Sequence, residues 1–299
     1  MYISKIIELR KLGYTYLKGS PYEHQALKEI DLSLNPGECL GIFGPNGSGK
    51  STLAKIINGL LGPTSGKAVV CGIDSASKSF NKHLWKKVGF VFQYPEKQIF
   101  KANVYDEVAY GPRNLGLSEP DVRHRVHDAL EKVGLIPGVY KNSSPVNLSG
   151  GERRRVAIAG ILAINPEIFI LDEPAAGLDA MGRKMVYEII KNRQANGSTV
   201  IIISHDLKEI INLIDRIVIL DHGAMIFDGK VKDLLAVPRI LAQYKCELPD
   251  YMQVINALTD KGIKVPTGLK GMTEVACEIS RILKENLNTL HNYAAKRVS

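Results

Sequence analysis

Eight consecutive residues follow the pattern G-x-x-x-x-G-K-S, which is typical of a loop that binds phosphate groups. They are Gly44, Pro45, Asn46, Gly47, Ser48, Gly49, Lys50 and Ser51. Glycines let the backbone N–H groups point inward around a polyphosphate, and the following helix adds a partial positive charge. Lys50 can reach the outer phosphates, and Ser51 can offer its hydroxyl to magnesium. The pattern predicts a nucleoside triphosphate ligand, with a chance glycine-rich turn as the alternative.

Two carboxylates follow an apolar segment later in the chain. Ile168 to Leu171 has the character of a buried strand, and Asp172 and Glu173 come directly after it. In hydrolysis of a nucleoside triphosphate, an aspartate can hold the water shell of magnesium while the next residue orients the attacking water. Acidic residues are common after strands, so this pair alone is weak evidence.

Two further polar side chains stand where apolar strands end. Gln93 follows the apolar run Val88 to Phe92, and His205 follows the run Thr199 to Ile203. The ends of strands are where sites are built in α/β sheets. A single histidine in such a place is more often structural.

The run Leu148-Ser149-Gly150-Gly151-Glu152 precedes a segment that we expect to be helical as far as about Ile164. Ser149 is a good N-cap, and glycine N–H groups at the start of a helix can bind an anion. A capped helix with no ligand is the alternative. Nearer the N-terminus, Tyr14 or Tyr16 could stack on a nucleobase, although such tyrosines more often pack across strands.

These residues need a sheet to bring them together. Cys39 to Phe43 is expected to be the strand before the phosphate loop, and Ser51 to Leu61 the helix after it, stopped by Gly62 and Pro63. Residues 1–35 alternate polar and apolar positions, which predicts an antiparallel β region. Residues 94–166 are expected to form a helical insert, and Ile217 to Phe227 a hairpin.

After about residue 236 the strand pattern stops, and two amphipathic helices are expected. Pro249 opens the first and Thr273 can cap the second. Their apolar faces are expected to comprise Tyr251, Val254, Ile255 and Leu258 in the first helix, and Ala276, Ile279, Leu283 and Leu287 in the second.

Length and composition set broad limits. The chain has 299 residues, of which 45% are hydrophobic, so it can bury an ample core. No apolar run approaches the roughly 18 residues that span a bilayer, and no signal peptide is evident. The net charge is +8, but its densest cluster, Arg153 to Arg155, has no interleaved aromatic residues, so we expect no nucleic-acid partner. The scattered cysteines, expected to be reduced and buried, are Cys39, Cys71, Cys246 and Cys277.

The ordered set of motifs resembles an ABC-type ATPase subunit over roughly residues 1–235. The resemblance implies an α/β fold: a P-loop NTPase of the ABC type, with an antiparallel β subdomain, a helical insert and a small helical appendage at 236–299. It also implies ATP and Mg²⁺ as cofactors. The residues implied to bind nucleotide are Tyr16 (Tyr14 being the second choice for the base), Gly44, Pro45, Asn46, Gly47, Ser48, Gly49, Lys50, Ser51, Thr52, Ser149, Gly150 and Gly151.

The same resemblance implies roles for the remaining motif residues. Ser51 and Gln93 would coordinate magnesium, and Asp172 would hold its water shell. Glu173 would polarise the attacking water, and His205 would contact the γ-phosphate. In this family the Ser-Gly-Gly element completes the site of an opposing subunit, so Ser149 and Gly151 are expected to act across a head-to-tail dimer, with Asp179 linking the two sites. Glu152 stands where many relatives have glutamine.

A narrower resemblance is to the ATPase subunits of energy-coupling-factor importers. It rests on Val91 to Phe100, Glu152 to Gly160, and Glu247 to Gly262 with Thr273-Glu274. Such importers take up vitamins or cobalt and nickel ions with two ATPases, a transmembrane scaffold and a separate substrate-binding membrane protein. The resemblance implies a peripheral subunit at the cytoplasmic face of the membrane, in a homodimer or in a heterodimer with a sister ATPase. The transported substrate is set by another polypeptide.

Other classes of function are weighed against this one. A subunit of a conventional ABC importer or exporter is the main alternative. A soluble ABC ATPase of DNA repair or of ribosomes would need a long coiled coil or tandem cassettes, which the sequence lacks. A scaffold that binds ATP without hydrolysing it would be expected to lack Glu173 or His205. Near Gln93, the apolar side chains Ile99 and Phe100 are expected to form a docking groove for a membrane partner, or else to pack the insert against the sheet.

Overall fold

The computed structural model describes residues 5–78, 80–235, 237–244, 247–263, 265–266, 269 and 271–284. The chain divides into two compact units, one up to Tyr244 and one from residue 245 onward. This boundary lies later than the one expected at residue 235, because α9 (Val231–Leu235) packs against α10 (Pro238–Gln243). Tyr244, which follows α10, donates a hydrogen bond from its hydroxyl to Asp221 Oδ2 at 3.1 Å.

A six-stranded sheet forms the centre of the first unit, in the order β10-β9-β3-β8-β7-β6. Its strands are β3 (Cys39–Phe43), β6 (Val88–Val91), β7 (Ile168–Asp172), β8 (Thr199–Ser204), β9 (Arg216–Asp221) and β10 (Ala224–Lys230). Every pairing is parallel except that of β9 with β10. Strands β3, β6, β7 and β8 are buried along their whole length, as near-continuous apolar strands in parallel sheets are. Their carboxyl ends meet at one edge, where sites in such sheets are built.

The second sheet is antiparallel, as the alternating pattern near the N-terminus predicts. Its order is β2-β1-β4-β5, formed by β1 (Ile7–Tyr16), β2 (His24–Leu34), β4 (Ser65–Val70) and β5 (Ile73–Asp74). Leu9 pairs with Leu32, and both are buried. The apolar face of this sheet is thus available to cover a helix.

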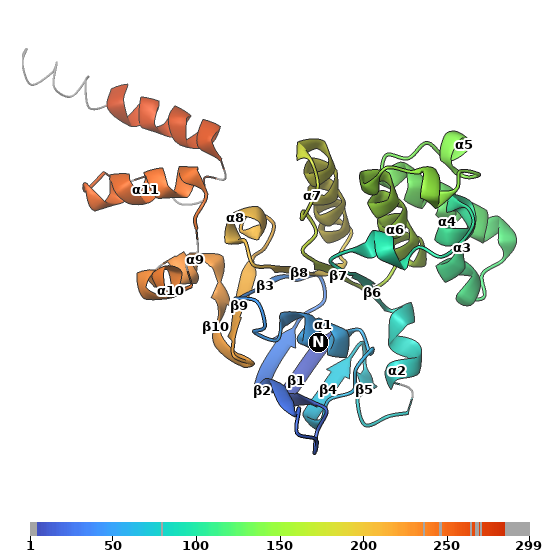
Figure 1. Ribbon diagram of the computed structural model, residues 1–299. Helices are drawn as coiled ribbons and strands as arrows, with labels where there is room; N and C mark the ends of the chain where they lie inside the picture. Colours follow the sequence, from blue (N-terminus) through green and yellow to red (C-terminus); the bar gives the residue numbers. More distant parts are fainter. Residues whose placement is uncertain are drawn as a thin grey trace, which may run out of the picture. The chain divides into compact units, whose positions relative to one another are not determined.

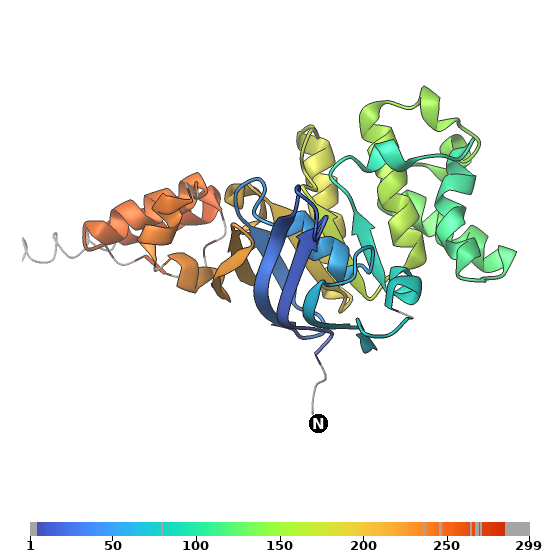
Figure 2. The ribbon, with the colours of Figure 1, turned by 60° about the horizontal axis from the view of Figure 1, so that its bottom comes forward.

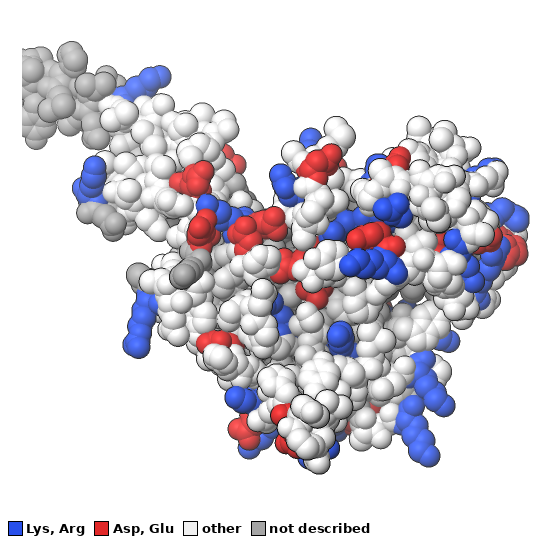
Figure 3. All heavy atoms as spheres, viewed as in Figure 1, with Lys and Arg blue, Asp and Glu red and all other residues white. Residues whose placement is uncertain are grey.

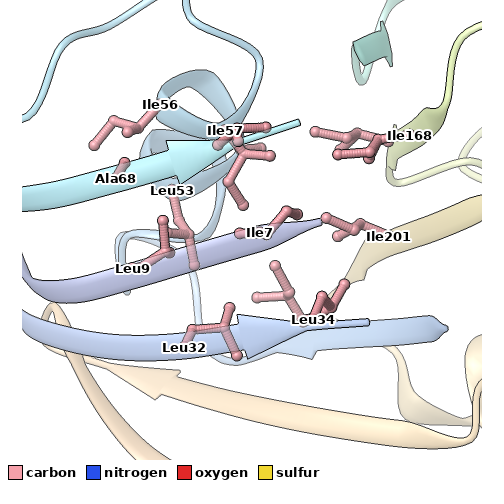
Figure 4. Packing of buried hydrophobic residues seen from close by; sticks show 14 of the residues in the cluster. Ile7, Leu9, Leu32, Leu34, Leu53, Ile56, Ile57, Ala68, Ile168 and Ile201 are labelled. Atoms are coloured by element: carbon pink, nitrogen blue, oxygen red, sulfur yellow. The ribbon is translucent and has the colours of Figure 1, made fainter. Parts of the chain in front are cut away.

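Helix α1 (Lys50–Ile57) lies between the two sheets (Figure 1). Its apolar residues Leu53, Ile56 and Ile57 belong to one cluster with residues of both sheets, among them Ile7, Ala68 and Ile168 (Figure 4). Burying each such side chain is worth about 1.5–3 kcal/mol relative to leaving it exposed. The helix ends four residues before the expected Leu61, because the chain turns at Gly59, which has a φ of 82°. This packing fixes the phosphate loop between strand and helix.

The helical insert contains α3 (Val104–Asn114), α4 (Glu119–Lys132), α5 (Pro137–Tyr140) and α6 (Gly150–Ile164). These helices gather at one side of the first unit, beyond β6 (Figure 2). Short elements connect them or precede them: α2 (Phe80–His83) and the 3-10 turns η1 (Leu84–Lys86), η2 (Pro95–Gln98) and η3 (Pro145–Asn147). Helices α7 (Ala180–Ala195) and α8 (Leu207–Ile210) follow β7 and β8.

The second unit contains α11 (Asp250–Asp260), which begins after Pro249 as expected, and a helix at 272–284. The expected apolar face of that second helix is wrong at Ala276 and Leu283. Val275 is buried, and Ile279 and Ile282 are partly buried, whereas Ala276 and Leu283 are exposed. Helical spacing predicts a stripe, but the packing decides which side of it is covered. Leu287 lies outside the described residues.

The cysteines differ in exposure. Cys39 is buried and Cys71 is half-buried, and burial raises the pKa of each thiol to about 12. Cys277 is exposed, contrary to the expectation for it, and Cys246 lies outside the described residues. Cys39, Cys71 and Cys277 are all free thiols. None of these three cysteines therefore cross-links the fold through a disulfide bond.

No helix in the described part of the chain is both long and apolar enough to cross a membrane. On the face drawn in Figure 3, basic and acidic side chains are interspersed and do not gather by sign into one continuous surface. The positive net charge is therefore not concentrated on that face.

Candidate functional site

The phosphate loop depends on glycine at two positions. Gly44 has a φ of 151° and Gly49 a φ of 104°, both in the region that side chains disfavour. A Cβ at Gly49 would lie 2.6 Å from the carbonyl oxygen of Ala26, and a Cβ at Gly44 would collide with the carbonyl of Leu220. The loop can therefore wrap tightly only because these residues have no side chain.

Two donors in the loop are buried. Lys50 Nζ donates to the carbonyl oxygens of Gly44 at 2.7 Å and of Pro45 at 2.8 Å. Burial lowers the pKa of Lys50, while the carboxylates of Glu173 and Asp172 oppose that shift. Ser48 Oγ is buried and has no hydrogen-bond partner among the described residues. An orphaned donor of this kind fits a loop that accepts an anionic ligand.

Oxygen atoms from separate elements meet beside this loop. Ser51 Oγ donates to Asp172 Oδ2 at 2.8 Å, and Gln93 lines the same cavity. Burial raises the pKa of Asp172, and the hydrogen bond from Ser51 opposes this. Hydroxyl, amide and carboxylate oxygens are the hard donors that magnesium prefers. The residues present fit a magnesium ion.

Glu173 has an unusual backbone and a fixed carboxylate. Its φ is 50°, which is rare for a residue with a side chain, and its N–H donates to the carbonyl of Ile203 at 2.9 Å. Oε1 accepts from the backbone N–H of His205 at 3.0 Å, and Oε2 accepts from Ser204 Oγ at 3.3 Å. The end of β8 thus fixes the direction of this carboxylate.

His205 is close to Glu173 but is not among the residues that line the cavity beside the phosphate loop. Its Nδ1 lies 2.6 Å from Glu173 Oε1, and 59% of its side chain is exposed. The structure therefore brings together two residues that the sequence placed at the ends of different strands. Because the imidazole of His205 is largely exposed, it can rotate toward a ligand without disturbing the packed core.

The cavity at the carboxyl edge of the sheet has a volume of about 230 Å³. It is lined by Tyr16, His24, Ala26, Asn46, Gly47, Ser48, Gly49, Lys50, Ser51, Thr52, Gln93, Asp172 and Glu173. His24 and Ala26 belong to no motif in the sequence, so they were not predicted to line the site. His24 reaches the cavity because β2 pairs with β1 in the register that sets it opposite Tyr16.

The two N-terminal tyrosines differ in position. Tyr16 lines the cavity, and its hydroxyl is hydrogen-bonded to Thr52 Oγ1 at 3.1 Å. Tyr14 packs against the core and contacts Tyr16 edge-on, with ring centroids 4.7 Å apart. This geometry favours Tyr16 over Tyr14 as the aromatic residue at the cavity.

Ser149 and Gly151 line a different cavity, of about 360 Å³. Its other lining residues are Glu152, Arg155, Gly177, Leu178, Asp179, Met181, Gly182 and Met185. Gly150, between the two motif residues, begins α6. Asp179 accepts a hydrogen bond from the N–H of Gly182 at 2.7 Å and caps α7. The Ser-Gly-Gly element and the phosphate loop therefore do not share a cavity within one chain.

Glu152 completes the cap of α6. Its Oε2 accepts from the N–H of Ser149 at 2.8 Å, and its Oε1 accepts from the hydroxyl of Tyr140 at 2.8 Å. Ser149 Oγ in turn accepts from the N–H of Glu152, which makes a reciprocal capping box. The bond from the backbone of Ser149 is the largest cause that lowers the pKa of Glu152 to about 2, followed by those from the Tyr140 and Ser149 hydroxyls. A carboxylate here therefore supports the same loop shape that a glutamine could.

An apolar groove of about 240 Å³ lies where η2 meets α3 and α6. Phe100, which lines it, is 61% exposed, so this residue does not pack the insert against the sheet. The ring of Phe100 contacts the ring of Tyr110 edge-on at 5.0 Å between centroids. Lys101 Nζ lies 4.7 Å from the first centroid and 4.6 Å from the second. The groove thus presents aromatic side chains to solvent.

Known proteins resemble the chain closely. Residues 27–176 match the ABC transporter family. The chain is 37% identical over 282 residues to the energy-coupling factor transporter ATP-binding protein EcfA2 of Clostridium perfringens. The aligned region covers 94% of this chain and 99% of the relative. It is 38% identical over 276 residues to a putative ABC transporter ATP-binding protein of Methanosarcina mazei, covering 92% of each.

Solved structures agree with these relatives. The structure of cbiO1 from Clostridium perfringens, part of the ABC transporter complex cbiONQ, superposes with a TM-score of 0.69 at 35% identity, over 86% of this chain and 97% of that one. An ATP-binding cassette solved as a dimer in a post-hydrolysis state with ADP and phosphate gives a TM-score of 0.67 at 31% identity, over 75% and 98%.

Proposed function

The chain belongs to the ABC transporter family of ATP-binding subunits, and from that premise we propose that it hydrolyses ATP to drive an importer of the energy-coupling-factor type. One observation carries this proposal. The phosphate loop, Gln93, Asp172 and Glu173 line one cavity, whereas Ser149 and Gly151 line another. A single chain thus holds two halves of different sites, as a subunit that works only as a dimer requires.

In this proposal ATP binds along the phosphate loop. Lys50 and the loop N–H groups bind the phosphates, the orphaned hydroxyl of Ser48 donates to them, and Tyr16 stacks on the base. Ser51, Gln93 and Asp172 hold magnesium, which supplies positive charge to offset the negative charge on the phosphates. These roles rest on the convergence of the side chains in one cavity.

Glu173 orients and polarises the attacking water, and His205 contacts the γ-phosphate. The hydrogen bonds from Ser204 and from the backbone of His205 hold the carboxylate in one direction. A general base positioned before the ligand arrives contributes more than a mobile one, because its orientation costs nothing during the reaction. Because His205 contacts both the γ-phosphate and Glu173, it links the position of that phosphate to the position of the general base.

A second ATPase subunit completes each site. Ser149, Gly150 and Gly151 act on the nucleotide held by the partner, and Asp179, in the same cavity as Ser149, links the two sites. The dimeric solved cassette that resembles this chain supports such an assembly. The partner is a second copy or a sister ATPase.

The subunit works at the cytoplasmic face of the membrane, together with a transmembrane scaffold and a separate substrate-binding membrane protein. The relatives named as energy-coupling factor subunits support the scaffold, and the apolar groove that contains Phe100 supplies a surface for one of its helices. Vitamins or cobalt and nickel ions are the substrate classes of such importers. The ATPase itself selects none of them.

Phe100→Asp tests the docking of the scaffold. Because Phe100 is largely exposed, the substitution is expected to change the melting temperature little and to leave ATP binding intact. It puts a charge into an apolar groove, so association with the scaffold and transport are expected to be lost. Co-purification with the membrane subunits, uptake and thermal melting measure these effects.

Val146→Asp is the matched control, since Val146 is also an exposed apolar residue of the insert but does not line the groove. It is expected to keep both association and uptake. A large fall in the melting temperature of Phe100→Asp, or unchanged association, would refute docking at this residue.

The second unit is proposed to hold the two ATPase subunits together when nucleotide is absent. Leu283 is 56% exposed on the helix at 272–284, and such a side chain can be buried against a second copy. A chain ending at Tyr244, and the full chain with Leu283→Asp, are both expected to dimerise less without ATP. Sedimentation or light scattering measures this, and equal dimerisation by all three proteins would exclude the role.

A further inference from the structure

Arg154 lies within the run of basic residues at the start of α6, yet its side chain is not on the surface. Only 5% of the residue is exposed. Its Nη2 donates to the carbonyl of Glu173 at 2.8 Å and of Pro174 at 3.1 Å, and its Nη1 donates to the carbonyl of Ala176 at 2.7 Å. One guanidinium therefore binds the backbone of the segment that leads from Glu173 toward Asp179.

This contact acts on a strained residue. Glu173 has a φ of 50°, and a side-chain-bearing residue persists in that region only where its surroundings hold it there. Its N–H is bound by Ile203 and its C=O by Arg154, so both of its backbone polar groups are fixed. The direction of the Glu173 carboxylate depends on this backbone conformation.

The hydrogen bonds of the guanidinium go to backbone carbonyls. Arg154 Nε is buried and has no hydrogen-bond partner among the described residues. The bonds that hold the guanidinium in place are therefore those from Nη1 and Nη2 to the carbonyls of Glu173, Pro174 and Ala176.

We propose that Arg154 is a positioning residue for ATP hydrolysis: it fixes the carbonyl of Glu173 and thereby aims its carboxylate. This rests on the proposed role of Glu173 as the residue that orients water.

Arg154→Gln, in the full-length protein purified with its membrane subunits, is the direct test. The amide is too short to span the three carbonyls, so Glu173 loses its fixed direction while the phosphate loop is untouched. The expected result is a fall in kcat of roughly 10- to 100-fold, with KM and the Kd for MgATP changed by less than about twofold. Arg154→Lys, which keeps the charge but not the planar fork, is expected to recover part of the lost kcat.

Arg193→Gln is the matched control. Arg193 is also an arginine with a buried, unpartnered Nε among the described residues, and it also donates to a backbone carbonyl, that of Pro166. It lies at the opposite end of β7 from Glu173 and should lower the melting temperature without changing kcat. If Arg154→Gln lowers kcat no more than Arg193→Gln does, or weakens ATP binding in proportion, the proposal is overturned.

Combined variants separate this proposal from the one on which it rests. In a Glu173→Gln background, Arg154→Gln is expected to cause no further loss of kcat, because it acts through Glu173. If Glu173→Gln itself leaves hydrolysis unchanged, the proposed function fails. If Glu173→Gln is slow and Arg154→Gln is normal, only the positioning role fails.

Discussion

Glu173→Gln is expected to lower the rate of ATP hydrolysis by about 100-fold or more while ATP binding persists. The amide has nearly the shape of the carboxylate and can still accept the hydrogen bond from the N–H of His205. It cannot accept a proton from water or hold the attacking water with a negative charge. Because hydrolysis is blocked after nucleotide is bound, the variant is expected to accumulate a dimer with ATP between its subunits. Phosphate release and size-exclusion chromatography with ATP measure the two effects.

Glu167→Gln is the control for that substitution. Glu167 directly precedes β7, at the opposite end from Glu173, and forms an ion pair with Lys87 at 3.1 Å. It is expected to hydrolyse ATP at the normal rate. Hydrolysis by Glu173→Gln at the rate of the unsubstituted protein would show that Glu173 does not orient the water.

Lys50→Ala is expected to weaken MgATP binding by at least about 100-fold, which corresponds to about 2.8 kcal/mol. The ammonium is buried at the loop, and a charge-assisted contact with phosphate is among the stronger hydrogen bonds in proteins. Alanine removes that charge while the glycines that shape the loop remain. Equilibrium binding of MgATP measures the loss.

Lys55→Ala provides the comparison, because Lys55 lies in the last turn of the same helix and is not among the residues that line the cavity. It is expected to bind MgATP normally. Unchanged affinity in Lys50→Ala, or an equal loss in both variants, would contradict the proposed role of the phosphate loop.

Local patterns determined the parts of the site that lie within one stretch of chain. The phosphate loop follows from glycines at 44 and 49, because their positive φ values disfavour a side chain. The cap of α6 by Ser149 and Glu152 also follows from its spacing, since both partners belong to one turn. The apolar strands before Asp172 and His205 follow from short buried runs. In each case the interacting groups are neighbours in the sequence.

The tertiary structure decided which distant residues meet. Ser51 and Asp172 bond because β3 and β7 are both in one parallel sheet, with β8 between them. His24 reaches the cavity through its register with Tyr16. The surface exposure of Phe100 was left open by the sequence, and the covered face of the helix at 272–284 differs in part from the predicted one.

Arg154 shows the difference most clearly. In the sequence it is the middle of three arginines, and charge alone predicts an exposed residue. In the fold it is buried, because α6 lies against the segment after β7, and the carbonyl groups of that segment accept hydrogen bonds from the Arg154 guanidinium. Local sequence sets backbone shape through sterics and nearby hydrogen bonds. Burial and partnership between residues far apart depend on how the strands and helices pack, which no local pattern records.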